Sequence, residues 1–179
     1  MQRWIIGNEN YLSYLRKTED RIPNSNYGES HYKPFFGELF SVGDLVYVTQ
    51  VSSVKPRHEK LKNSKDFFKL YISSGKAGKP DELVAVVNLN YMFPVPYRLI
   101  EYLEMKNIDQ VRGFGSEEEK TKYINLLNKE IEAINVLRID TKAQNLYSFV
   151  EKYPEAKISQ RCFNFKFLEQ IALKYSDDR

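Results

Sequence analysis

Short apolar runs recur along the first hundred residues, and their spacing and their β-branched and aromatic content are typical of β-strands. Gly43 and Asp44 predict a turn, so that residues 33–49 form an antiparallel hairpin. Residues 91–96 do not predict a regular ladder strand, because Pro94 and Pro96 lack N–H donors. The expected strands are residues 3–6, 33–40, 45–49, 67–72, 83–88 and an edge strand within 97–103.

The later part of the chain changes to helical spacing. Ser116 and the three glutamates after it predict a helix start, with a break near residues 138–141 and a second helix that stops at Pro154. A closing helix is expected over 163–175, and Asn8 predicts the cap of an early helix over 10–17. Strands first and helices later predict an α+β fold, with residues 1–179 as a single domain. We expect helices on one face of the sheet and an open hairpin edge.

The composition agrees with a globular core, since 42% of the 179 residues are hydrophobic and 14% are aromatic. The mean hydropathy is −0.55, and no apolar run approaches the roughly 20 residues that cross a bilayer. The N-terminal apolar segment is too short for a signal peptide. Cys162 is the single cysteine, so no internal disulfide can form. We therefore expect a soluble cytoplasmic protein, with Trp4 and Cys162 in the core.

Positive charge is concentrated in the basic segment, residues 55–79. Its eight lysines and arginines outnumber Glu59 and Asp66, for a net charge of +6, although the whole chain carries only +3. Such a segment favours a polyanion partner, and a solvated lysine-rich loop is the plainer alternative. The expected RNA contacts include two tyrosines that could stack on bases. His58 is also among them, and a surface-loop histidine is the plainer alternative to a general base there. These contacts are Tyr27, Tyr32, Arg57, His58, Lys60, Lys62, Lys65 and Lys69.

The candidate chemistry lies just past the predicted hairpin, where Ser52 and Ser53 precede Lys55. Lys33 starts the hairpin, so it is expected at the same edge of the sheet as the two serines. No metal-ligand spacing and no cofactor-binding glycine motif is present, so we predict neither a metal nor a cofactor.

RNA cleavage by its own 2′-hydroxyl needs neither a metal nor a cofactor. Lys33 and Lys55 would neutralise the phosphate, while Ser52 and Ser53 would donate hydrogen bonds to it. A hydrolase that uses Ser53 with His58 is a second reading, although no nucleophile elbow surrounds either serine. A non-catalytic RNA-binding module is a third.

Several segments, taken in order, resemble the ToxN/AbiQ family of endoribonuclease toxins from type III toxin–antitoxin systems. The resemblance extends over most of the first hundred residues and continues more loosely in the C-terminal helices. The segments are Tyr11 with Tyr14-Leu15, Ile22-Pro23-Asn24-Ser25, Lys33-Pro34-Phe35-Phe36-Gly37, Ser52-Ser53-Val54-Lys55, Phe67-Phe68-Lys69-Leu70, Val87-Asn88-Leu89 with Met92-Phe93-Pro94, and Cys162-Phe163 with Phe165 and Phe167-Leu168-Glu169.

The resemblance implies a compact, highly twisted antiparallel sheet surrounded by helices, akin to MazF/Kid-type toxins. It implies metal-independent cleavage of single-stranded, A-rich RNA, leaving a 2′,3′-cyclic phosphate and a 5′-hydroxyl. Its implied partners are cellular and phage mRNA and a repeated pseudoknot RNA antitoxin, rather than DNA or a membrane. The toxin would cut that antitoxin from a repeat precursor and join it in a closed heteromeric ring, acting in abortive infection.

The resemblance also implies site residues. The family's catalytic lysine falls on Lys33, and its Thr-Ser-Pro-Lys element falls on residues 52–55. Serine at position 52 keeps the hydroxyl of threonine, whereas Val54 replaces the proline, which is displaced to Pro56. The family's tyrosine in the loop before Lys33 corresponds to either Tyr27 or Tyr32.

Overall fold

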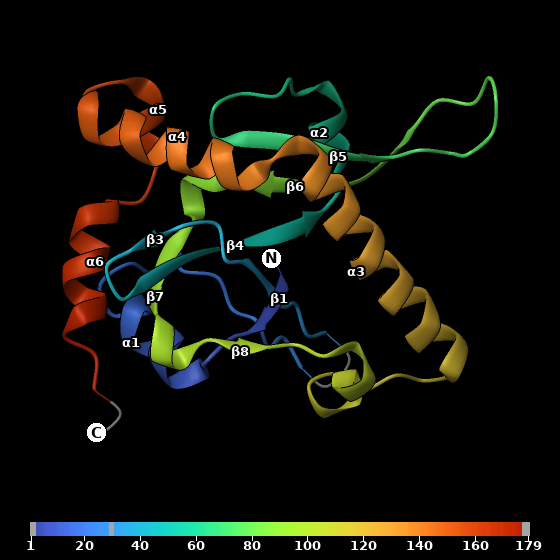
Figure 1. The fold of residues 1–179 in the computed structure, drawn as a ribbon, viewed down its shortest axis with the longest axis horizontal. Coiled ribbons are helices and arrows are strands. Elements are labelled where there is room, and N and C mark those ends of the chain that lie inside the picture. Colours follow the sequence, from blue (N-terminus) through green and yellow to red (C-terminus); the bar gives the residue numbers. More distant parts are fainter. Residues whose placement is uncertain (1–2, 29–30, 177–179) are drawn as a thin grey trace.

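The computed structural model describes residues 3–28 and 31–176, and these residues form an eight-stranded antiparallel sheet with helices around it (Figure 1). The main strand order is β5-β6-β4-β2-β1-β8, with β3 and β7 also paired to β4. The strands are β1 (Arg3–Ile6), β2 (Phe35–Gly37), β3 (Ser41–Val42), β4 (Leu45–Ser53), β5 (Phe67–Ile72), β6 (Glu82–Asn88), β7 (Phe93–Pro96) and β8 (Glu101–Tyr102). The predicted α+β class is confirmed.

Strand β4 organises the sheet because four other strands pair with it. Its first half pairs with β3 and β7, and its second half pairs with β2 and β6. The hairpin predicted over residues 33–49 is confirmed: Gly43, at φ +56°, turns the chain between β3 and β4. The sequence pattern ended this strand at residue 49, whereas β4 continues to Ser53.

Strand β7 differs from the expectation for residues 91–96, because it pairs with β4 along its whole length. Pro94 lies opposite Tyr47 and Pro96 lies opposite Leu45. On its other side, the backbone N–H of Tyr47 donates to the Phe40 carbonyl and its carbonyl accepts from the Leu39 amide. The prolines therefore stand at positions where the ladder requires no N–H donor, and an edge strand tolerates them.

The helices begin and end close to the predicted residues. Asn8 caps α1 by accepting from the Tyr11 amide at 3.0 Å, and Ser116 caps α3 by accepting from the Glu119 amide at 3.2 Å. Arg138, at φ +50°, separates α3 from α4. The helices are α1 (Glu9–Arg16), α2 (Pro56–Lys60), α3 (Glu117–Leu137), α4 (Ile139–Lys152), α5 (Lys157–Arg161) and α6 (Phe165–Leu173), with 3-10 turns at Leu89–Tyr91, Tyr97–Leu99 and Met105–Gln110.

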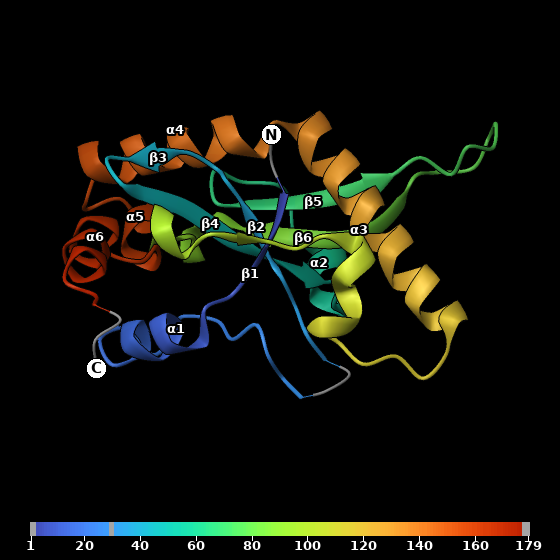
Figure 2. The same ribbon diagram turned by 60° about the horizontal axis from the view of Figure 1, so that its bottom comes forward.

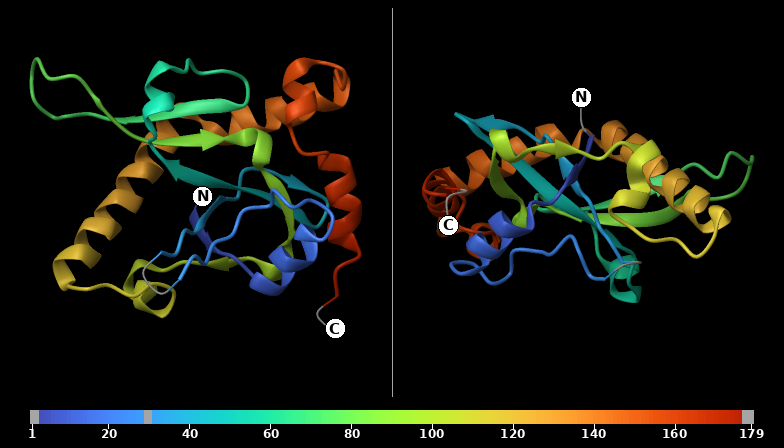
Figure 3. Two further views of the ribbon diagram at one scale, coloured as in Figure 1. Left: turned by 180° about the vertical axis from the view of Figure 1, so that it is seen from behind. Right: turned by 90° about the horizontal axis from the view of Figure 1, so that it is seen from below.

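Helices lie on both sides of the sheet, not on one side as predicted. Figure 2 and the right panel of Figure 3 show α3 and α4 on one side and α1 and α2 on the other. Helix α2 was not predicted, because five residues are too few to show helical periodicity. Its position matters for function, since it holds the beginning of the basic segment against β5.

Buried aromatic and polar contacts fix the helices to the sheet. Trp4 is buried as predicted, packs edge-to-face on Phe36 and donates its indole N–H to the Leu127 carbonyl at 3.1 Å. Cys162 is also buried as predicted, and burial raises the pKa of its thiol to about 12.

Within the described ranges 3–28 and 31–176, none of the helices is long and apolar enough to cross a membrane.

An ion pair between a half-exposed arginine and a buried carboxylate joins α5 to the start of β5. Arg161 donates from Nε and from a terminal nitrogen to the Asp66 carboxylate, both at 2.6 Å, and Ser64 donates to it at 2.7 Å. Burial alone would raise the pKa of Asp66, but the hydrogen bonds from Arg161 and Ser64 outweigh it and hold that pKa below its usual range. The basic segment is therefore anchored at a carboxylate in its middle.

Candidate active site

The register of β2 against β4 places Lys33 and Ser52 at the same end of this strand pair. Phe35 pairs with Gln50, so Lys33 lies two residues before the last pair and Ser52 lies two residues beyond it. Lys33 is exposed and Ser52 is half-buried. This juxtaposition agrees with the edge position predicted for both residues.

The two serines lie inside β4, and not beyond its end as expected. Ser52 pairs with Val86 and Ser53 with Ala85, and this long-range pairing with β6 has no local sequence signal. Because successive strand residues point to opposite faces, the hydroxyls of Ser52 and Ser53 are directed apart. Ser53 is exposed at the strand end.

Ser52 lines a small cleft of about 60 Å³, together with Arg21, Pro23, Asn88 and Tyr91. Arg21 brings a cation to this cleft and is ion-paired to Glu19 at 2.8 Å. The sequence did not indicate Arg21 as a site residue, because it follows two acidic residues and lies outside the basic segment.

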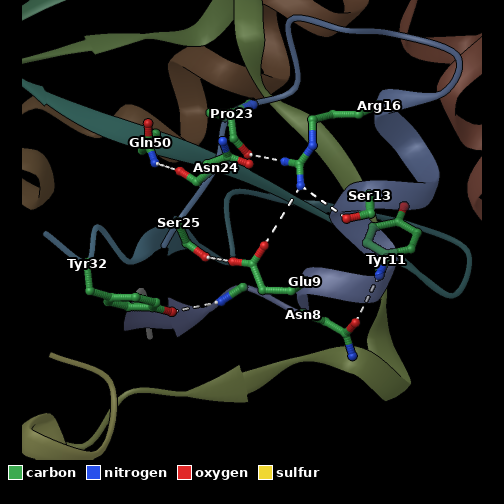
Figure 4. A network of polar contacts seen from close by, with 11 residues as sticks. Asn8, Glu9, Tyr11, Ser13, Arg16, Pro23, Asn24, Ser25, Tyr32 and Gln50 are labelled. Carbon is green, nitrogen blue, oxygen red and sulfur yellow. Dashed lines mark hydrogen bonds and ion pairs between the residues drawn. The ribbon is translucent and has the colours of Figure 1, made fainter. Parts of the chain in front are cut away.

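The segment before Lys33 is tied to α1 and to β4 (Figure 4). We call it the Lys33 loop, residues 22–28 and 31–33. The Lys33 amide donates to the Ser25 carbonyl at 2.7 Å, and the Ser25 hydroxyl donates to Glu9 of α1 at 2.9 Å. Gln50 of β4 donates to the Asn24 carbonyl at 2.6 Å. These bonds connect the backbone of Lys33 to the strand that carries Ser52.

The two candidate tyrosines of this loop differ sharply in exposure. Tyr27 is 50% exposed, and the Lys33 ammonium lies 5.6 Å from the centre of its ring. Tyr32 is only 5% exposed, and its hydroxyl accepts from the Gly7 amide at 3.1 Å. Burial raises the pKa of Tyr32. The burial of Tyr32 therefore argues against its expected stacking on a base, whereas Tyr27 is placed where it could stack.

The carbonyl of Tyr32 is held from the opposite direction by two side chains that no sequence pattern indicated. Arg112 donates to it at 3.3 Å and the Tyr123 hydroxyl donates to it at 3.0 Å. The Arg112 guanidinium also lies 4.0 Å from the centre of the Tyr123 ring. The Lys33 loop is consequently held from α1, from β4 and from α3.

Lys55 is exposed and stands immediately before α2, whose first residue is Pro56. Proline suits this position, because the first helical N–H has no intrahelical partner. The Lys55 amide donates to Nδ1 of His58 at 3.0 Å, and the His58 amide donates to the Lys55 carbonyl at 2.8 Å. One residue thus binds both backbone groups of Lys55.

His58 is buried, with 4% of its surface exposed, and its ring packs against Phe67 of β5 at 5.8 Å between centroids. The expectation of a surface-loop histidine is wrong, and a ring this buried does not favour the expected RNA contact. The reason is that α2 folds onto β5, which the charge pattern cannot reveal. Its buried ring is also turned to Lys55, and not exposed beside Ser53 as a general base would require.

The basic segment divides between two faces of the sheet. Arg57, Lys60 and Lys62 are exposed on and after α2, and Lys69 of β5 donates to the Glu59 carbonyl of α2 at 2.8 Å. Lys65 instead lies over the ring of Phe149 in α4, at 5.1 Å, on the side of the sheet opposite α2 (Figure 2). The structure therefore does not bring Lys65 together with the cations of α2.

The sequence matches the family described as the toxin ToxN of type III toxin–antitoxin systems over residues 4–173. The endoribonuclease ToxN of Pectobacterium atrosepticum is 27% identical over 173 residues, which cover 93% of this chain and 88% of that protein.

Solved structures show the same fold. AbiQ, a lactococcal anti-phage endoribonuclease of the type III class, superposes with a TM-score of 0.73 at 19% identity, covering 97% of this chain and 96% of AbiQ. A protein of a bacterial antiviral system that a processed non-coding RNA regulates gives 0.74 at 22% identity, covering 97% and 99%. A type III toxin–antitoxin protein from a system in which an RNA pseudoknot selectively inhibits the toxin gives 0.72 at 20% identity, covering 98% of each chain.

The family match extends over nearly the whole chain, and it agrees with the architecture of these solved structures. The protein therefore belongs to the ToxN family of toxins from type III toxin–antitoxin systems.

Proposed function

We propose that this protein is an endoribonuclease that cleaves single-stranded, A-rich RNA without a metal ion, with Lys33, Ser52, Ser53 and Lys55 as its catalytic residues. The observation that carries the proposal is the register of β2 and β4, which brings Lys33 and Ser52 to one end of a strand pair. The relative from Pectobacterium atrosepticum, an endoribonuclease that aligns with 93% of this chain, supports the reaction class.

The reaction is an attack of the RNA 2′-oxygen on the adjacent phosphorus. The 2′-oxygen–phosphorus bond forms while the bond from phosphorus to the 5′-oxygen breaks. The 2′-hydroxyl loses its proton, and the departing 5′-oxygen gains one. The products are a 2′,3′-cyclic phosphate and a 5′-hydroxyl. Lys33 and Lys55 offset the charge that develops on the phosphoryl oxygens, and a serine hydroxyl donates a hydrogen bond to them.

The two serines have unequal roles in this proposal. Ser53 is exposed at the end of β4 and donates to the phosphate, while Ser52 lies half-buried in the cleft beside Arg21. The hydrolase reading, with His58 as the base for Ser53, loses its support because Nδ1 of His58 accepts from the Lys55 amide.

RNA binding is the part of the proposal that the surface supports. Tyr27 offers an exposed ring beside Lys33, and Arg57, Lys60 and Lys62 surround α2 with positive charge. Such a surface predicts that binding weakens steeply as salt increases. We propose that the inhibitor is a repeated pseudoknot RNA, as in the system of one structural relative, joined with the toxin in a closed ring.

The biological role follows from the same inhibitor. The gene of the inhibitor is expected as a short tandem repeat just upstream of the coding region. Once released from this inhibitor, the toxin would cut cellular and phage mRNA in abortive infection. AbiQ, which shares the fold, is an anti-phage endoribonuclease.

The test is cleavage of an A-rich RNA oligonucleotide by the purified protein in EDTA, compared with the Lys55→Ala and Ser53→Ala variants. We expect cut RNA from the unaltered protein and a loss of about 100-fold or more from each variant. The exposed Lys129 of α3 and Ser148 of α4 supply matched controls, Lys129→Ala and Ser148→Ala, which should cleave normally. Binding without cleavage would instead identify a non-catalytic RNA-binding module.

A further inference from the structure

His58 is a buried imidazole in contact with a residue of the proposed site. We propose that neutral His58 is a positioning residue. It fixes the backbone of Lys55, so that the lysine ammonium is placed to contact the scissile phosphate. This inference rests on the proposed function, in which the Lys55 ammonium binds the scissile phosphate.

Two reciprocal hydrogen bonds carry the inference. The Lys55 amide donates to His58 Nδ1 at 3.0 Å, and the His58 amide donates to the Lys55 carbonyl at 2.8 Å. The side chain three residues into a helix often reaches back to the amide of the capping residue, and glutamine or glutamate usually fills this role. Here an imidazole fills it, and the residue whose backbone it holds is the proposed catalytic lysine.

The hydrogen bond defines the tautomer of the ring. A neutral imidazole has one acceptor nitrogen, and Nδ1 is that acceptor for Lys55, so Nε2 carries the proton. Nε of Arg57 lies 3.4 Å from Nε2, and this is therefore an approach of two donors rather than a second good hydrogen bond. A second proton on the ring would convert Nδ1 into a donor facing the Lys55 amide.

The surroundings of His58 favour the neutral ring. Its ring contacts the ring of Phe67 of β5 at a tilt, and the charged groups near it are Arg57, Lys55 and Lys69. Burial, together with these three cations, lowers the pKa of His58 below its ordinary value. Lys69 also donates to the Glu59 carbonyl, so β5 holds the far end of the same helix. The His58 ring thus links β5 to the backbone of Lys55.

The experiment compares three variants in the cleavage assay, with thermal unfolding as a check on folding. His58→Ala removes the acceptor, His58→Gln keeps an acceptor of the usual capping type, and Glu59→Gln is a matched change at the exposed next position. We expect the turnover number of His58→Ala to fall roughly 10- to 100-fold with little change in KM. His58→Gln should recover most of the activity, and Glu59→Gln should turn over normally.

The pH profile separates positioning from simple structural support. Activity of the unaltered protein should fall as His58 gains its second proton, which happens at pH values below the ordinary pKa of a histidine. The His58→Gln variant lacks this titrating group, so its acid loss should be smaller. If His58→Ala fails to fold, the activity and pH profile of His58→Gln decide the question.

Failure of the inference and failure of the proposed function give different results. If the unaltered protein cuts RNA and Lys55→Ala does not, but His58→Ala turns over normally, the positioning role is wrong. The role is also wrong if His58→Gln is as impaired as His58→Ala. If the unaltered protein cuts no RNA, or Lys55→Ala cuts as well as it does, the proposed site itself is wrong.

Discussion

The two lysines of the proposed site are held in contrasting ways. The backbone near Lys33 is bound through Ser25 to α1 and through the Tyr32 carbonyl to Arg112 and Tyr123. The backbone of Lys55 depends on one residue, His58, in a helix of five residues. One lysine is held by several elements and the other by a single residue.

This difference allows the effect of each lysine's charge on cleavage to be separated from the effect of its position. Either lysine should be indispensable if its ammonium meets the phosphate, however its backbone is supported. Substitution of the supporting residues should have different effects at the two lysines. The Lys33 loop keeps several hydrogen bonds when one is lost, whereas loss of the imidazole leaves the Lys55 amide without its acceptor. Single substitutions should therefore be tolerated around Lys33 and costly around Lys55.

The largest effects are expected from the lysines themselves. Lys33→Ala and Lys55→Ala should each lower the turnover number by about 100- to 1000-fold, because each removes a charge from the transition state. Single-turnover cleavage of an A-rich oligonucleotide measures this, with Lys129→Ala as the control. A Lys33→Ala protein that cleaves normally would remove Lys33 from the site.

The serines should rank by exposure. Ser53→Ala should lower cleavage by about 100-fold, and Ser52→Ala should lower it less, because only Ser53 is exposed at the end of β4. The same assay, at saturating RNA, compares the two variants. A greater loss from Ser52→Ala would mean that the phosphate enters the cleft beside Arg21.

Glu130 tests the stability of the helix that supports the Lys33 loop. Burial raises the pKa of this α3 carboxyl from about 4.5 to about 7, so the folded state holds a proton that the unfolded chain has released. The stability from this proton is complete below about pH 4.5 and is lost as the pH rises through about 7. Glu130→Gln should therefore raise the free energy of unfolding at pH 8 by about 2 kcal/mol and change it little at pH 4. Urea titrations at both pH values measure this, and equal effects at both would contradict it.

The smallest effect is expected from Tyr32→Phe. This change removes the hydroxyl that accepts from the Gly7 amide, at a cost of about 1 kcal/mol, but leaves the Tyr32 carbonyl bonded to Arg112 and Tyr123. Cleavage should remain close to normal, in contrast to His58→Ala. Thermal unfolding and the cleavage assay together check this, and a large loss of turnover would show that the Lys33 loop also depends on one contact.

Local patterns were sufficient for much of the fold. The caps at Asn8 and Ser116, the turn at Gly43 and the apolar runs of β5 and β6 are all local signals, and the structure confirms them. The prolines of β7 misled because their effect depends on which side of the strand faces β4. No short-range pattern contains that information.

The sequence offered residues for the candidate site, but it could not predict how deeply each is buried. Tyr32 and His58 resemble surface residues in sequence, yet both are buried by elements distant along the chain or by a short helix folded on β5. Ser52 and Ser53 read as a loop because their strand partner is β6. Long-range pairing decided each of these outcomes.

Replacement of one 2′-hydroxyl tests whether the RNA's own hydroxyl attacks the scissile phosphate. An A-rich RNA oligonucleotide that the protein cuts in EDTA is prepared with a single 2′-deoxynucleotide on the 5′ side of the scissile phosphate. We predict that this RNA is not cut there, and that the unmodified RNA yields a 2′,3′-cyclic phosphate and a 5′-hydroxyl. Cleavage of the deoxy-substituted RNA at the same bond would contradict attack by the RNA's own hydroxyl.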